Sequence, residues 1–194
     1  MKKVKIYDCL YVVLDFIRFC FIVFIVLLLV NTFIIRNKVV SGSSMYPTLK
    51  DQERLWINVA ASYCTEIKRF DVVVAKYASN GQLWIKRVIG LPNETIQYKD
   101  DCLYVNGKKV EEPFLDQAYI QSVKEEQLLT KFTQDTKEIV LKDDEYFLVG
   151  DNRIASLDSR DEHVGAFSRS AIISKGGVVY YPFQEMRFIG NGRK

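Results

Sequence analysis

The stretch SGSSMYPTLK, residues 41–50, places three serine hydroxyls beside a stiff Met-Tyr-Pro segment. A serine hydroxyl is a weak nucleophile and needs a base within hydrogen-bond reach. The sequence has a single histidine, His163, which lies in the charged stretch RDEHVGAFSR. A solvated surface imidazole is the simpler interpretation of His163, so we do not expect a serine–histidine–aspartate triad.

A neutral lysine is the other base that can serve a serine. Lysine ionises near pH ~10.4 in water, and it must leave the solvent to reach the ~7–8 that suits catalysis. Such a lysine belongs in an apolar strand, and LWIKRVIGLP contains Lys86 and Arg87. Strand alternation sends the two side chains to opposite faces, and only Lys86 can give up its proton. The simpler alternative is an edge-strand lysine whose amine reaches water.

The elements that would position these residues are strands. Beyond residue 38 the apolar residues alternate or form short runs between turn signals. Five segments have this pattern: 69–77, 82–92, 95–110, 145–153 and 176–183. Asn106-Gly107 indicates a two-residue hairpin turn. Segment 117–136 is polar enough to be a helix, a long loop or an insertion, so the sequence predicts an all-β globule around it.

Composition narrows the function classes. The chain has 194 residues, 48% of them hydrophobic, which suits one compact domain with a short appendage and excludes global disorder. The formal charge of +3, from 27 basic and 24 acidic residues, argues against a nucleic-acid partner.

The four cysteines form no C-x-x-C pair, and with one histidine the sequence predicts no metal site and no cofactor. A Cys64–Cys102 disulfide stays an alternative to four free thiols.

An apolar run precedes the strands. Residues 19–35 read FCFIVFIVLLLVNTFII and carry no charge. About 17–20 such residues, at ~1.5 Å rise, just cover a ~30 Å hydrocarbon core. A cleaved signal peptide would have a shorter apolar region that ends in small residues, whereas this one ends in Ile34, Ile35 and Arg36. We therefore expect a retained transmembrane anchor at 19–35.

The flanking charges predict the orientation of this anchor. Basic residues precede it at positions 2, 3, 5 and 18, and fewer follow it, at 36 and 38. An excess of basic residues favours the cytoplasmic side. We therefore expect residues 1–18 in the cytoplasm and residues 36–194 as an extracytoplasmic catalytic domain of a single-pass protein of the cell membrane.

Four segments, in order, resemble the signature boxes of type I signal peptidases, most closely those of Gram-positive bacteria: SGSSMYPTL, RFDVVV, KRVIGLPNE and GDNRIASLDSR. These enzymes are membrane-anchored serine/lysine endopeptidases that remove signal peptides from exported proteins. The resemblance runs from the apolar segment to Phe183. It implies an antiparallel β-sheet fold with a smaller variable insertion, here at about 99–144.

The resemblance also implies roles for individual residues. Ser44, directly before Met45, matches the nucleophile, and Lys86 matches the general base. Met45 and the following proline would shape the loop that presents Ser44. Ser156 matches a hydroxyl that holds the lysine amine.

Two carboxylate residues complete the matched set. Asp158 and Arg160 match an ion pair that braces the site, with a surface pair of little worth as the simpler alternative. Asp151, together with Arg153, would lie in the loop beneath it. Gly42 stands where some relatives have a serine that donates to the oxyanion, which leaves the backbone N–H of Ser44 and an unidentified second donor.

The implied substrates are preproteins cut after small residues, of Ala-x-Ala type, by an enzyme that we expect to be a monomer at a lipid bilayer. Two rival functions fit parts of the sequence. A non-catalytic relative would have lost Ser44 or Lys86, and both are present. A self-cleaving serine/lysine repressor would carry a DNA-binding helix-turn-helix where this chain has its apolar run.

Overall fold

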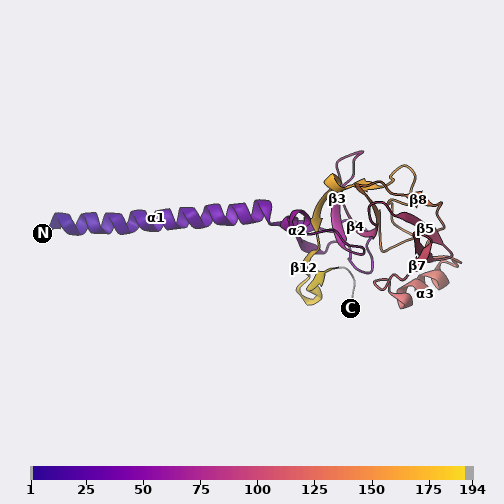
Figure 1. Cartoon of the computed structure of the whole chain (residues 1–194). Coiled ribbons are helices and arrows are strands. Elements are labelled where there is room, and N and C mark those ends of the chain that lie inside the picture. Colours follow the sequence, from indigo (N-terminus) through magenta and orange to yellow (C-terminus); the bar gives the residue numbers. More distant parts are fainter. Residues whose placement is uncertain (1, 191–194) are drawn as a thin grey trace.

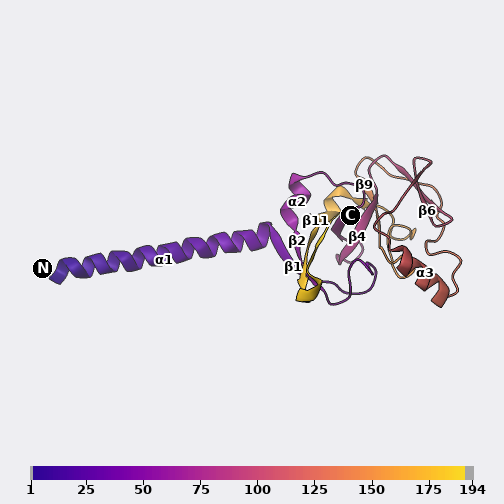
Figure 2. The same cartoon turned by 90° about the horizontal axis from the view of Figure 1, so that it is seen from below.

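A long helix precedes a β-rich globule (Figure 1). The structure is a computed structural model that describes residues 2–190. Helix α1 (Lys2–Phe33) projects away from the globule in both views (Figures 1 and 2). Its segment Leu10–Val30 has a mean hydropathy of 2.8 and none of it is buried. In the described part of the chain, this helix alone is long and apolar enough to cross a membrane.

The first sheet follows α1 directly. It has the order β1-β2-β12-β13, with all neighbours antiparallel. Its strands are β1 (Ile35–Val39), β2 (Arg54–Asn58), β12 (Gly177–Tyr181) and β13 (Arg187–Ile189). In β2, Leu55 and Ile57 point into the core, whereas the alternate residues Arg54, Trp56 and Asn58 are exposed. This sheet therefore has one solvated face. The short helices α2 (Val59–Cys64) and η2 (Phe183–Glu185) follow β2 and β12.

The second sheet is the centre of the globule. Its order is β10-β9-β4-β3-β11. The strands are β10 (Phe167–Ser168), β9 (Glu145–Val149), β4 (Leu83–Gly90), β3 (Val72–Lys76) and β11 (Ile172–Lys175), with a short helix η1 (Arg169–Ala171) before β11. Residues of β3 and β4 contribute to all three hydrophobic clusters of the core. The side chains of β4 are therefore held on both faces.

The third sheet lies farthest from α1 in both views (Figures 1 and 2). Its order is β7-β6-β5-β8, from β5 (Thr95–Lys99), β6 (Cys102–Val105), β7 (Lys108–Val110) and β8 (Ile139–Val140). Helix α3 (Gln117–Glu126) lies between β7 and β8 in the chain, and Asp116 caps it by accepting hydrogen bonds from the N–H groups of Ala118 and Tyr119.

The sequence predictions can be compared with these elements. Each of the five predicted strand segments contains at least one strand, and the fold is mainly antiparallel β, as expected. Asn106 and Gly107 both have positive φ in the turn that joins β6 to β7, which confirms the predicted hairpin. Segment 117–136 begins with helix α3 and continues as a loop.

Other boundaries differ from those expected. The helix of the apolar run starts well before residue 19, and Ile35 is already the first residue of β1. The third sheet starts at Thr95, before the expected insertion at 99. Six strands lie outside the five predicted segments: β1, β2, β8, β10, β11 and β13. Cys20, Cys64 and Cys102 are free thiols, and the Cys9 side chain lies outside the described part.

Candidate active site

The loop that carries Ser44 connects β1 to β2 and is closed at its base by backbone hydrogen bonds. The Val40 N–H donates to the Glu53 carbonyl over 2.8 Å, and the Gln52 N–H donates to the Val40 carbonyl over 3.0 Å. Met45 is 2% exposed and packs into the hydrophobic cluster beneath the first sheet. Because Met45 points into the core, its neighbour Ser44 is presented at the partly exposed surface of the loop.

Lys86 comes from the middle of β4 and is 4% exposed. Its amine donates a hydrogen bond to the Ser156 hydroxyl oxygen over 2.9 Å, and within the described residues it forms no ion pair. Desolvation lowers the pKa of Lys86 to about 8, although the Asp158 carboxylate opposes the shift. Since β4 has a neighbour on each side, the alternative of an edge-strand lysine is wrong.

Ser156 and the ion pair that follows it stand behind this amine. Arg160 pairs with Asp158 through Nε at 2.8 Å and Nη2 at 2.9 Å, and the Asp158 carboxylate is almost fully buried. Burial would raise the pKa of Asp158, but the hydrogen bonds and charge of Arg160 hold it below its ordinary value. The Ser156 hydroxyl also lowers the pKa of Asp158. The alternative of an exposed surface pair is therefore wrong.

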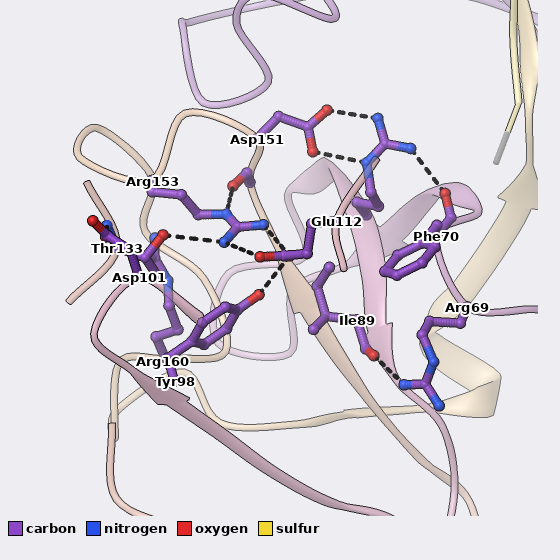
Figure 3. Close-up of polar contacts among 12 residues, drawn as sticks. Arg69, Phe70, Ile89, Tyr98, Asp101, Glu112, Thr133, Asp151, Arg153 and Arg160 are labelled. Carbon is purple, nitrogen blue, oxygen red and sulfur yellow. Dashed lines mark hydrogen bonds and ion pairs between the residues drawn. The ribbon is translucent and has the colours of Figure 1, made fainter. Parts of the chain in front are cut away.

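The turn after β9 ties the Ser44 loop to β4. Asp151 accepts two hydrogen bonds from the Arg87 guanidinium, over 2.8 and 2.6 Å, and a third from the Thr48 hydroxyl over 2.5 Å. The same guanidinium donates a third bond to the Phe70 carbonyl over 2.8 Å, and Figure 3 labels both acceptors, Asp151 and Phe70. Asp151 and Arg153 both lie in this turn, and the ion-pair partner of Asp151 is Arg87, on the face of β4 opposite to Lys86.

Asn152 binds the backbone of the loop that carries Ser44. Its N–H donates to the Ser44 carbonyl over 3.1 Å, and its side-chain amide donates to the Ser43 carbonyl over 3.2 Å. Asn152 and Thr48 were not among the predicted site residues. Both lie inside the matched boxes. Thr48 follows Pro47 and Asn152 follows Asp151, and a short polar side chain at these positions could have indicated that each contacts the site.

Gly150 is the point where three segments meet. A Cβ atom at this position would lie 2.2 Å from the Ser156 hydroxyl oxygen and 2.4 Å from the Ser44 carbonyl oxygen. Its N–H donates to Asp158 over 2.9 Å. Only glycine therefore allows the Ser44 loop and the Ser156 segment to approach each other this closely.

Ser44 and Lys86 line the same cleft, which has a volume of about 300 Å³. One wall is formed by the end of β1 and the Ser44 loop, with Val39, Val40, Ser41 and Met45. The other is formed by the start of β4, with Leu83, Trp84 and Ile85, and Leu157 also lines the cleft. The hydrogen bond of the amine goes to Ser156 and not to Ser44. Gly42 lies outside this lining, and its N–H donates to Asp51 over 2.7 Å.

The structure thus brings Ser44, Met45, Lys86, Asp151, Ser156, Asp158 and Arg160 into one contiguous site. His163 is elsewhere, with a side chain that is 97% exposed and bonded to Asp161. Among the residues that the structure describes, no group of three histidine, cysteine or acidic side chains could hold a metal ion. The chemistry available at the site is that of a hydroxyl beside a desolvated amine.

Comparisons with known proteins place the chain in a family. Residues 13–181 match the family "Signal peptidase, peptidase S26". Signal peptidase I T of Bacillus subtilis (strain 168) is 41% identical over 160 residues, 82% of this chain and 81% of the relative. Signal peptidase I S of the same organism is 38% identical over 175 residues, 90% of this chain and 92% of the relative.

A crystal structure of a signal peptidase I from Enterococcus faecalis V583 is 31% identical and covers 57% of this chain and 97% of that one, with a TM-score of 0.48. The family match covers most of the chain, and the two Bacillus relatives are similar to it over nearly their whole length. The chain therefore belongs to the signal peptidase I family of serine endopeptidases, peptidase S26.

Proposed function

We propose that this signal peptidase cuts preproteins with Ser44 as nucleophile and neutral Lys86 as general base. The observation that carries the proposal is the buried Lys86 amine, which has a hydroxyl partner in Ser156, no carboxylate partner among the described residues, and a pKa lowered to about 8. Such an amine has an uncharged fraction at neutral pH far larger than that of a free lysine and is mostly uncharged above pH 8, and a base must be uncharged. It opens onto the same cleft as Ser44.

The hydrogen bonds around Ser156 explain how the amine is oriented. Lys86 donates an N–H to the Ser156 oxygen, and we infer that Ser156 passes its own proton to the Asp158 carboxylate, whose pKa it lowers. An amine that donates to Ser156 points its lone pair elsewhere, and we propose that it points into the cleft. Ser156 is thereby a positioning residue.

The reaction then follows in two steps. Lys86 takes the Ser44 proton as the serine oxygen bonds to the scissile carbonyl carbon, and the resulting ammonium gives that proton to the leaving amine. An acyl-enzyme is left. Lys86 next takes a proton from water, the water oxygen displaces Ser44 from the acyl carbon, and the proton returns to Ser44.

The cleft supports cleavage after small residues of the Ala-x-Ala type. It runs between the end of β1 and the start of β4. Alternate side chains of an extended peptide laid between them would point into it. Apart from Ser41, Ser44 and Lys86, the residues that line the cleft are apolar, which suits small apolar side chains such as that of alanine.

The position of the apolar helix supports a site at the membrane surface. From Ile35 to Ser44 is nine residues, which span at most ~30 Å. The sheet next to α1 also exposes large apolar side chains: Trp56, Tyr181, Phe183, Met186 and Phe188. We propose a monomer with α1 in the bilayer, its N-terminus cytoplasmic and the globule outside, so that enzyme and signal peptide share one plane.

The test uses the full chain in detergent with a preprotein that has an Ala-x-Ala site. Ser44→Ala should reduce kcat by about 10⁴-fold or more, because the nucleophile is lost. Ser43→Ala is the matched control, because its side chain is exposed and only its carbonyl is used. Parent-like cleavage by Ser44→Ala would refute the proposal. A substrate with phenylalanine in place of the alanine before the cut should not be processed.

A further inference from the structure

A further buried ion pair lies behind the candidate site and joins the segment after the third sheet's β7 to the turn after β9. Arg153 contacts Glu112 through Nη2 at 2.5 Å and Nη1 at 3.1 Å, and the Arg153 side chain is 0% exposed against 6% for Glu112 (Figure 3). Glu112 comes from the segment between β7 and α3. The pair therefore connects the variable part of the fold to the segment that carries Asp151 and Asn152.

The remaining donors of Arg153 reach the catalytic turn and the loop before β8. Its Nε donates to the Gly150 carbonyl over 3.2 Å, and its Nη1 donates to the Thr133 hydroxyl over 3.2 Å. Gly150 is where the Ser44 loop and Ser156 come closest. The guanidinium thus fixes the peptide unit on which the spacing of the two loops depends.

Glu112 is itself held in one orientation. The Tyr98 hydroxyl, from β5, donates to the same carboxylate oxygen that receives Nη2, over 2.9 Å. Tyr98 is fully buried, and the Arg153 guanidinium lies 5.1 Å from its ring centre. Burial would lower the pKa of Arg153, but Glu112 and Tyr98 raise it, so the guanidinium stays charged and keeps all its donors.

We propose that Glu112 is a positioning residue for proteolysis: through Arg153 it fixes the turn from Gly150 to Ser156, and with it the approach of the Lys86 amine to Ser44. The simpler alternative is that the Glu112–Arg153 pair contributes only to stability. A buried ion pair is weak evidence for that, because well-packed apolar residues often stabilise as much. The inference rests on the function proposed for Ser44 and Lys86.

The experiment compares Glu112→Gln with Glu111→Gln in the full chain in detergent. Glu111 is the matched control, because it has the same charge in the same segment but is exposed. Glu112→Gln should lower kcat by about 10- to 100-fold and change KM by less than about threefold. The reason is that a displaced catalytic group slows the chemical step, whereas the contacts that bind the peptide stay the same. Glu111→Gln should match the parent in both constants.

A double variant separates positioning from stability. Glu112→Gln leaves the buried Arg153 charge without its partner and should lower Tm, whereas Glu112→Gln with Arg153→Met removes both charges and should restore Tm. The double variant should keep the low kcat, because Gly150 has lost its donor. Restoration of kcat together with Tm, or a parent-like kcat in Glu112→Gln, would overturn the proposal.

Two further variants keep the outcome decisive. Tyr98→Phe retains the ring but removes one hydrogen bond to Glu112, so it should fold even if Glu112→Gln does not, with kcat lowered by about two- to fivefold. If Tyr98→Phe folds and its kcat equals that of the parent, the result counts against the proposal. Ser44→Ala belongs in the same series: if it is inactive while Glu112→Gln is normal, only the inference fails, and if it is active, the proposed function fails.

Discussion

The two faces of β4 carry neighbouring cationic side chains that have different hydrogen-bond partners. Arg87 is 1% exposed and its guanidinium is bonded to both oxygens of Asp151 and to the Phe70 carbonyl, with the Phe114 ring 4.0 Å away. Lys86 is 4% exposed, and the hydrogen-bond partner of its amine is a hydroxyl. Burial is therefore the same on both faces, and the partners differ.

The difference shows how one strand can supply both an anchor and a base. A buried cation remains charged when a carboxylate and several acceptors compensate for the lost water. Without them the neutral form is favoured, which arginine cannot adopt and lysine can. The fully paired face holds the turn after β9 in place, and the unpaired face delivers an amine that can accept a proton.

The most severe test exchanges the two cations. Lys86→Arg should lower kcat by about 10⁴-fold, because the guanidinium has no lone pair to accept the Ser44 proton. Arg87→Lys should retain measurable cleavage, since the charge stays but the bidentate contact is lost. Both are measured with a preprotein substrate in detergent. Activity of Lys86→Arg within tenfold of the parent would show that the two faces are not functionally distinct.

The second test breaks the paired face. Arg87→Met leaves the Asp151 carboxylate buried without its cation, which should lower the free energy of unfolding by about 3–5 kcal/mol. Denaturant unfolding followed by circular dichroism measures the change. The reference is Arg54→Met, a change at an exposed arginine of β2. A loss of less than about 1 kcal/mol would mean that Asp151 finds other partners.

The third test removes the uncompensated amine. The Lys86 pKa falls from 10.5 to about 8 on folding, so below pH 8 the native state must hold a buried ammonium that it disfavours. Lys86→Met should therefore raise the free energy of unfolding by about 2 kcal/mol at pH 6 while it abolishes cleavage. The gain should shrink as pH rises from 8 to 10.5. A destabilised variant at pH 6 would contradict the assigned desolvation.

The smallest expected effect concerns the pH profile. Because the neutral amine is the reactive form, kcat/KM should rise with pH and level off above an apparent pKa near 8. His163→Ala should leave this profile unchanged, since the imidazole is exposed to solvent and is not among the residues that line the cleft. A rising limb that disappears in His163→Ala would redirect the search for the base.

Local pattern was sufficient for much of the fold. Strands β3 and β4 have apolar runs with turn signals on both sides, and Asn106-Gly107 determines its own turn. Strand β2 has Trp56 on its exposed face, which hides the alternation. Strand β1 continues the apolar run of the helix, so composition does not mark the change of structure at Ile35.

The site was predictable in its types of residue and less so in its pairings. Ser44, Lys86 and Ser156 lie within ordered motifs, and the structure assembles them. The partner of a buried charge depends on which distant segment is brought against it. Asp151 meets Arg87 across 64 residues and Arg153 meets Glu112 across 41, and no periodicity encodes either distance.

The close approach of the Ser44 loop and the Ser156 segment at Gly150 also determines when proteolysis can begin during synthesis. Asn152 and Ser43, which it brings together, are 109 positions apart, so the reactive serine leaves the ribosome long before the segment that fixes it. A partly made chain has the nucleophile but neither the ordered loop nor the oriented amine. We expect the nascent enzyme to be inert, including toward its own apolar N-terminal stretch, until residues as far as Arg160 have folded.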